Sequence, residues 1–205
     1  MHTDTSEKGL EALIVESLIK DAGYRQGKPE DYDREHAVDL AMLMEFLRNT
    51  QPDMLAKLGI ESEGPSRIKF LHRLQGEIAK NGTVHMLRRG ISHGPGTVDL
   101  FYGTPNPSNK KAVELYGQNI FSVTRQVRYS EDNTKLALDM AVFINGLPVI
   151  TFELKNRLTK QTVEDAVRQY RNDRDEKDLL FQFGRCVVHF AVDDHEVRMC
   201  THLMG

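Results

Sequence analysis

The chain has 205 residues, of which 40% are hydrophobic and 28% are charged. This balance is typical of a globular protein and excludes disordered, collagenous and coiled-coil chains. No apolar run approaches the ~20 residues that a membrane helix needs, and the first residues show no secretory signal. Two cysteines, Cys186 and Cys200, are too few for a disulfide framework. We therefore expect a cytoplasmic protein with reduced thiols and no membrane partner.

The net charge of −3 conceals an uneven distribution along the chain. Residues 1–64 carry 7 basic and 14 acidic side chains, residues 65–174 carry 17 and 10, and residues 175–205 carry 3 and 6. The middle segment therefore has a net charge of +7. Such a segment could face a polyanion or form a solvated basic surface, and charge alone favours neither interpretation.

The first part of the chain has the spacing of helices. Apolar residues from Leu10 to Leu18 predict a helix over 6–21, with Asp4 or Ser6 as its cap. Three further helices are predicted over 35–50, from Pro52 to Gly59, and from Ser66 to about Lys80.

The second part has the texture of strands. Strands are predicted over 84–87, 98–102, 120–129, 136–144, 147–154, 186–192 and 196–201. Asn145-Gly146 gives the strongest hairpin signal. Helical stretches are predicted over 111–116 and 162–174, the second with a buried stripe of Val163, Ala166, Val167 and Tyr170.

This order of elements predicts a single mixed α/β domain over 1–205. Its helical part covers about 1–82 and its sheet-containing part about 83–205, with residues 61–66 as the best candidate for a linker. The chain stops at THLMG without a visible closing cap, so we expect a piece of a longer protein.

Three ionisable residues converge on the predicted hairpin. Glu153 and Lys155 lie two apart on one strand and share a face, and Asp139 interrupts the preceding apolar strand. Two neighbouring carboxylates repel each other, and Mg²⁺, which takes oxygen ligands, relieves that repulsion. A bound metal polarises a phosphoryl oxygen, and a nearby Lys stabilises developing charge. The set suits hydrolysis of a phosphodiester, although on pattern alone an exposed Glu–Lys pair is the commoner interpretation.

A shared metal also constrains the hairpin geometry. With a regular two-residue turn, paired residue numbers sum to 291, so Glu153 faces Leu138 and Asp139 points to the other face. We therefore predict an odd-length loop or one bulge within 139–153.

The D-x13-ExK pattern resembles the PD-(D/E)xK nuclease signature, with Leu138 in place of the usual proline. The run FINGLPVITFELKN and the helix TVEDAVRQYRND resemble the N-terminal nuclease domain of the restriction (R, HsdR) subunit of type I restriction–modification enzymes. The resemblance covers nearly the whole chain, including the helix that ends in DAGY and the segment ISHGPGTVDLFYGTPNP.

The resemblance implies an α/β fold with a restriction-endonuclease-like mixed β-sheet, flanking helices and an N-terminal helical segment. It implies a type I site-specific deoxyribonuclease that uses Mg²⁺ and cuts duplex DNA at non-specific positions after translocation. ATP would serve only a motor elsewhere in the subunit, and the partners would be DNA and the methyltransferase (M) and specificity (S) subunits. The alternative is a catalytically silent domain of the same fold that docks or couples partner subunits.

For the site, the resemblance implies that Asp139 and Glu153 hold Mg²⁺ together with the main-chain carbonyl of Leu154. Lys155 would position the nucleophilic water, and Gln169 would support the site or the substrate.

Two further positions are less sharply defined. The family's Q-x-x-x-Y pattern is not kept, because Asp173 follows Gln169 four residues later, and Tyr170 fits the apolar stripe of its helix. Related nucleases place a glutamate of the first helix near the metal, which makes Glu11 a candidate ligand, with an exposed helix face as the alternative.

Other motifs are absent. No G-x-x-x-x-G-K-[ST] occurs, so ATP binding is not predicted for this chain. Four histidines have no zinc-type spacing with one another or with cysteine: His85, His93, His189 and His195. We expect them to be core or surface residues.

Overall fold

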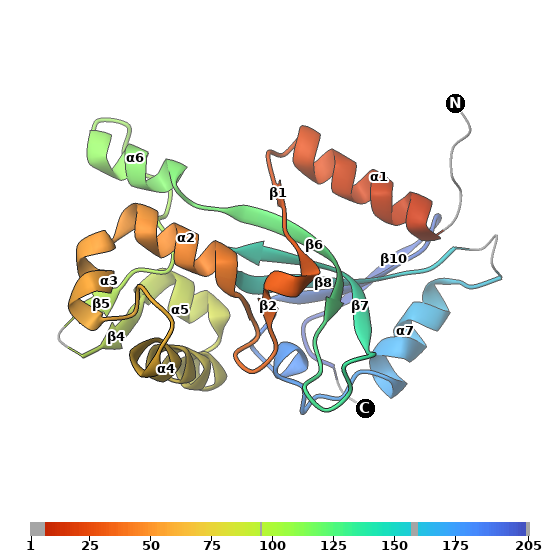
Figure 1. Cartoon of the computed structure of the whole chain (residues 1–205). Coiled ribbons are helices and arrows are strands. Elements are labelled where there is room, and N and C mark those ends of the chain that lie inside the picture. Colours follow the sequence, from red (N-terminus) through yellow and green to blue (C-terminus); the bar gives the residue numbers. More distant parts are fainter. Residues whose placement is uncertain (1–6, 95, 157–159, 204–205) are drawn as a thin grey trace.

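The computed structural model describes residues 7–94, 96–156 and 160–203. A six-stranded mixed sheet with the strand order β1-β6-β7-β8-β9-β10 forms its centre (Figure 1). Its strands are β1 (Arg25–Gln26), β6 (Phe121–Arg128), β7 (Ala137–Ile144), β8 (Leu147–Leu154), β9 (Val188–Val192) and β10 (Val197–Cys200). The β1–β6 and β8–β9 pairs are parallel and the other three pairs are antiparallel.

Seven α-helices surround the sheet in the described part of the chain. They are α1 (Glu7–Lys20), α2 (Leu40–Thr50), α3 (Pro52–Leu58), α4 (Pro65–Asn81), α5 (Thr83–Arg89), α6 (Lys110–Gly117) and α7 (Val163–Asn172). Short elements complete the fold: 3-10 turns at Pro29–Asp31 and Leu179–Phe181, a hairpin of β2 (Tyr32–Asp33) and β3 (Val38–Asp39), and a hairpin of β4 (Ile91–His93) and β5 (Gly96–Val98). The mixed α/β prediction is confirmed.

Two hydrophobic clusters hold the layers together. The larger joins α1 to α5 to the strands β4 to β8, and the smaller joins α7 and the 3-10 turn at Leu179–Phe181 to β6, β7 and β9. Figure 1 shows α2 to α6 gathered at one end of the sheet and α7 at the other. The hairpin β7–β8 contributes to both clusters, so the strands that carry the predicted site lie at the centre of the molecule.

The predicted helix over 35–50 begins later than expected, at Leu40. The carboxylate of Asp39 accepts a hydrogen bond from the main-chain N–H of Met42 at 3.0 Å and so caps α2. The residues before Asp39 form the β2–β3 hairpin, a pairing that helical periodicity could not reveal. For the first helix, the expected caps Asp4 and Ser6 lie outside the described residues.

The predicted strand over 84–87 is wrong, because this segment lies within the helix α5. Thr83, Met86 and Leu87 are buried whereas Val84 is 49% exposed, which is helical and not alternating burial. The predicted strand over 98–102 is also wrong beyond Val98, where β5 ends. There the main-chain N–H groups of Asp99 and Tyr102 bond to side-chain oxygens of Gln51 and Asn119.

Candidate metal-dependent nuclease site

The hairpin β7–β8 has a two-residue turn and one bulge. Asn145 and Gly146 both have positive φ, 50° and 81°, as a type I′ turn requires. Next to the turn Ile144 pairs with Leu147, and paired numbers sum to 291. From the pair Val142–Ile150 onward the sum is 292, because Val149 is an extra, bulged residue of β8.

The bulge confirms the prediction for this hairpin. The last regular pair is Met140–Phe152, and the same register continued by one residue sets Asp139 opposite Glu153. At that point the Asp139 Oδ2 atom accepts a hydrogen bond from the main-chain N–H of Leu154 at 2.7 Å. A side chain has therefore replaced a strand carbonyl as the acceptor, and the carboxylate of Asp139 is fixed against β8.

Glu153 is fully buried, with no exposed surface. Burial raises the pKa of its carboxyl to about 8. Attraction to Arg174 opposes this shift, and repulsion from Asp139 adds to it. The Oε2 atom of Glu153 is buried without a hydrogen-bond partner. An unpartnered carboxylate oxygen is costly in a protein interior, and it is free to bind a cation.

The other carboxylate oxygen of Glu153 is held by Arg174, which follows the end of α7. The Arg174 Nε atom donates to Glu153 Oε1 at 2.6 Å. The remaining guanidinium nitrogens donate to the hydroxyl of Tyr129 at 2.8 Å and to the carbonyl of Ala137 at 3.0 Å. Arg174 thus ties Glu153 to the residue that follows β6 and to the first residue of β7, and its five donors in a rigid fork suit such bridging.

Lys155 directly follows the end of β8, two residues after Glu153. Its side chain is buried, its charge lowers the pKa of Glu153, and its main-chain N–H donates to the carbonyl of Val192 at 2.8 Å. The structure therefore brings together Asp139, Glu153 and Lys155 as the sequence predicts, and adds Arg174.

Helix α7 covers this part of the sheet through Tyr170. The Tyr170 hydroxyl lies 2.9 Å from Thr151 Oγ1, which in turn lies 2.7 Å from His189 Nδ1. Tyr170 is a core residue, as predicted. Gln169 is half-buried on the same helix, and within the described residues no side-chain hydrogen bond joins it to Asp139 or Glu153.

Glu11 is buried on α1 instead of lying on an exposed helix face. Its carboxylate forms an ion pair with Arg125 of β6, and its Oε2 atom lies 3.5 Å from Gln126 Nε2. The β6–β7 register sets Gln126 opposite Asp139, so Glu11 lies one strand away from the carboxylate pair. Gln126 has a positive φ of 52°, an uncommon conformation that marks a local irregularity of β6.

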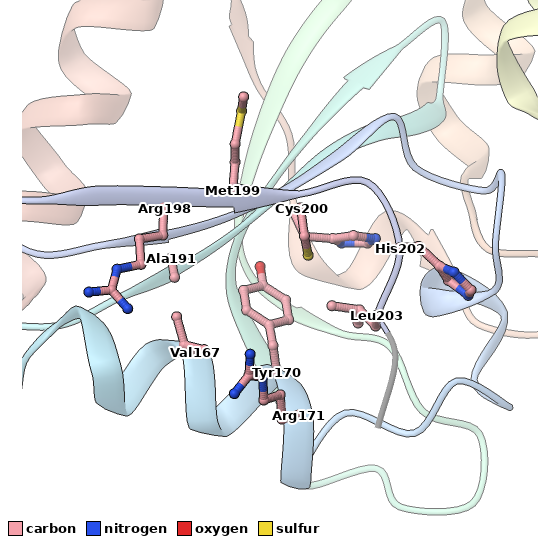
Figure 2. A pocket seen from close by; sticks show the side chains of 10 residues that line it. Val167, Tyr170, Arg171, Ala191, Arg198, Met199, Cys200, His202 and Leu203 are labelled. Atoms are coloured by element: carbon pink, nitrogen blue, oxygen red, sulfur yellow. The ribbon is translucent and has the colours of Figure 1, made fainter.

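A cavity of about 360 Å³ lies beside this site, between α7 and the strands β9 and β10. Figure 2 shows Val167, Tyr170 and Arg171 of α7 on one side of it and Arg198, Met199 and Cys200 of β10 on the other. Ala191, on its wall, is the register partner of Glu153. The cavity borders β9, the neighbour of β8 in the sheet, but Asp139 and Glu153 do not line it.

Arg174 is the residue of the site that sequence reasoning missed. It follows a helix within the run RNDRD, where four of the five residues are charged and no periodicity marks one position. Only its contact with Glu153, 21 residues away in the chain, distinguishes it.

Among the described residues, no helix has both the length and the apolarity needed to cross a membrane. Comparison with known proteins gives a more specific result. Residues 4–204 match the family model described as "Type I restriction enzyme R protein N terminus". Two proteins of Methanocaldococcus jannaschii, named as the type I restriction enzyme MjaIXP and MjaVIIIP endonuclease subunits, are each 32% identical to this chain, over 78 and 76 residues. Each alignment covers 37% of this chain and less than a tenth of the relative, 8% and 7%.

The family model covers almost the whole chain, and the candidate site lies within the matched residues. The chain therefore belongs to the family of type I restriction enzyme R protein N-termini.

Proposed function

We propose that this chain is the Mg²⁺-dependent endonuclease domain of a type I restriction R subunit and hydrolyses phosphodiester bonds of duplex DNA. The observation that carries the proposal is the buried, unpartnered Oε2 atom of Glu153, a residue that the continued register of the β7–β8 hairpin sets opposite the second carboxylate, Asp139. Membership of the R-subunit family supports it.

The donor set fits a hard divalent cation. Asp139 and Glu153 offer carboxylate oxygens, and the main-chain carbonyl of Leu154 would add a neutral oxygen, all of the kind that Mg²⁺ prefers. A bound Mg²⁺ would polarise a phosphoryl oxygen and lower the pKa of a water molecule. When the cation is absent, the positive charges of Lys155 and Arg174 offset the negative charges of Asp139 and Glu153. This balance limits the repulsion between the two carboxylates.

The chain's own residues then have separate tasks. Asp139 and Glu153 would bind the Mg²⁺ ion. Arg174 fixes the orientation of Glu153 through its Oε1 atom. The ammonium group of Lys155 holds the attacking water and stabilises the charge that develops on the phosphate. The water oxygen bonds to phosphorus, the bond from phosphorus to one sugar oxygen breaks, and a proton passes to that leaving oxygen. Glu11 on α1 supports the site indirectly, through its ion pair with Arg125 of β6, and Gln169 on α7, which bonds to neither carboxylate, would support the substrate.

In the whole enzyme, cutting follows translocation by an ATP-driven motor in the rest of the R subunit, at non-specific positions. The domain works in a complex with the methyltransferase and specificity subunits. A double-strand cut requires two such domains, because one site hydrolyses one strand at a time.

A second candidate function is a catalytically silent docking module of the same fold. The ion pair of Glu153 with Arg174 favours it, since a fully buried carboxylate that already has a cationic partner is a common structural arrangement. The two functions differ in what Mg²⁺ does: a nuclease binds it at Asp139 and Glu153, whereas a docking module does not.

The test combines calorimetry of Mg²⁺ binding with nicking of supercoiled plasmid. We expect Mg²⁺ to bind the 205-residue chain, Asp139→Asn to abolish binding, and Lys155→Ala to keep binding but lose Mg²⁺-dependent nicking. Lys111→Ala, which alters an exposed lysine, serves as the matched control and should behave as the parent chain. No Mg²⁺ binding by the parent chain, or equal binding by Asp139→Asn, would favour the docking module.

A further inference from the structure

A second group of metal-binding side chains lies where the β2–β3 hairpin meets helix α4. Glu35 and His36 belong to the turn of the hairpin, and His72 lies on α4. One possible ligand atom from each residue lies within 4.8 Å of those of the other two. Among the described residues, this is the one group of three or more histidine, cysteine or carboxylate side chains whose possible ligand atoms lie so close together. His72 lies 36 positions after His36 in the chain, so no spacing motif could reveal the group.

His36 is the anchor of this group. It is 4% exposed, and its Nδ1 atom lies 2.7 Å from Asp33 Oδ2. The main-chain N–H of His36 also donates to Asp33, at 3.3 Å. When the neutral ring donates Nδ1–H to this carboxylate, its Nε2 atom is unprotonated and its lone pair is available to a metal. That Nε2 atom is buried and has no hydrogen-bond partner.

Glu35 and His72 leave the group open to solvent. Both side chains are 57% exposed, so an ion can reach them without opening the core. The His36 and His72 rings meet at 4.8 Å between centroids, and His72 Nε2 lies 3.6 Å from Glu35 Oε1. That distance permits an ion pair but is too long for a hydrogen bond.

We propose that Glu35, His36 and His72 form a binding site for a Zn²⁺-type transition metal, with Asp33 orienting His36 from behind. Two imidazoles and a carboxylate suit Zn²⁺ and its first-row neighbours better than Mg²⁺, which prefers oxygen alone. Three protein ligands leave a fourth tetrahedral position for water. The metal satisfies the buried Nε2 atom and links the β2–β3 hairpin to α4. The site is separate from Asp139 and Glu153 and does not depend on the proposed nuclease function.

The test uses ZnCl₂ and CoCl₂ as probes of the 205-residue chain. It is run in the Asp139→Asn background, so that the carboxylate pair on the hairpin does not contribute. We expect one Zn²⁺ per chain by calorimetry, a rise in Tm with added Zn²⁺, and the visible absorption of tetrahedral Co²⁺. His72→Ala and Glu35→Gln should each weaken binding by about tenfold or more, and Asp33→Asn by about 10–100-fold.

His85→Ala is the matched control, because it removes an exposed histidine from another helix. His72→Ala changes a side chain that is more than half exposed, so the variant is expected to fold, and its Tm without metal checks this. The proposal is overturned if Zn²⁺ does not bind, or if it binds equally well to the His72→Ala and His85→Ala variants.

Discussion

At the scale of single residues, the pairing of Glu153 with Arg174 decides the state of the site. Full burial raises the pKa of the Glu153 carboxyl and favours its protonated form, whereas the charge of Arg174 favours the anion. Arg174 also bridges to Tyr129 and Ala137, so it fixes both the charge and the place of Glu153. Removal of one partner from a buried pair costs more than the pair contributes, since the other charge stays buried.

We predict that Arg174→Gln lowers the free energy of unfolding by about 3–5 kcal/mol, because Glu153 is left without its cationic partner. Urea denaturation measures this change. The cost should be much smaller in a Glu153→Gln background, where no buried anion remains. Arg171→Gln, at an exposed position in the last turn of α7, is the control and should be near neutral. Equal costs of Arg174→Gln in both backgrounds would contradict the assigned pairing.

At the scale of elements, the β7–β8 turn is fixed from outside the hairpin. Asn145 is fully buried, and its side chain bonds to Ile120, Leu100 and Asn119. The carbonyl of Gly146 accepts a hydrogen bond from the main-chain N–H of Asp39 at 2.8 Å. The turn is thereby joined to the start of α2.

Gly146 has no room for a side chain. A Cβ atom there would lie 2.4 Å from the Asp39 carbonyl oxygen and 2.7 Å from the Leu43 main-chain nitrogen, and φ is 81°. We predict that Gly146→Ala costs about 2–4 kcal/mol of stability, from overlap and backbone strain together. Gly103→Ala, where a Cβ meets nothing within 4 Å, should stay within about 0.5 kcal/mol of the parent in the same denaturation assay. A Gly146→Ala variant as stable as Gly103→Ala would show that the turn can move.

The cap of α2 makes stability depend on pH. Asp39 is 1% exposed, and burial raises the pKa of its carboxyl to about 6 from an ordinary value of 3.8, although the Met42 N–H opposes the shift. The folded state therefore holds this proton more tightly than the unfolded state, and the contribution of Asp39 to stability falls as pH rises through the window between these values.

We predict that Asp39→Asn, which keeps an oxygen to cap the helix but cannot ionise, gains about 1–3 kcal/mol over the parent chain between pH 4 and pH 7. Thermal unfolding across this range measures the difference. Asp53→Asn, at an exposed position in the first turn of α3, should show no comparable gain. Parallel pH profiles for Asp39→Asn and the parent would contradict this account.

The elements differ in how far sequence could predict them. The β7–β8 hairpin was predictable because a type I′ turn requires two positive φ angles, which Asn and Gly tolerate best, and the need for Asp139 and Glu153 to share a face predicted the bulge. The segment 84–87 was mispredicted because four residues of mixed polarity fit both periods, and packing of Met86 and Leu87 decided for helix. Arg174 was unpredictable because its role depends entirely on a distant contact.

At the scale of the whole molecule, this chain matches less than a tenth of the two relatives, so its activity has to be tested in the assembled enzyme. We predict that Asp139→Ala, Glu153→Ala and Lys155→Ala each abolish DNA cutting by the complex while ATP hydrolysis and translocation continue, because the three residues contact no nucleotide motif. Cleavage gels and ATPase assays on the same preparations measure both. Normal cutting by any one variant would remove that residue from the mechanism.

The hydrogen bond from the Leu154 amide to the Asp139 carboxylate makes one backbone proton a reporter of the site. Since β8 is a central strand, we expect most of its amides to exchange with solvent deuterium only when the sheet opens as a whole. The Leu154 amide is protected instead by a side chain that a divalent cation would also engage. Its exchange rate, compared with that of its neighbours in β8, therefore follows the position of Asp139 without any cleavage reaction.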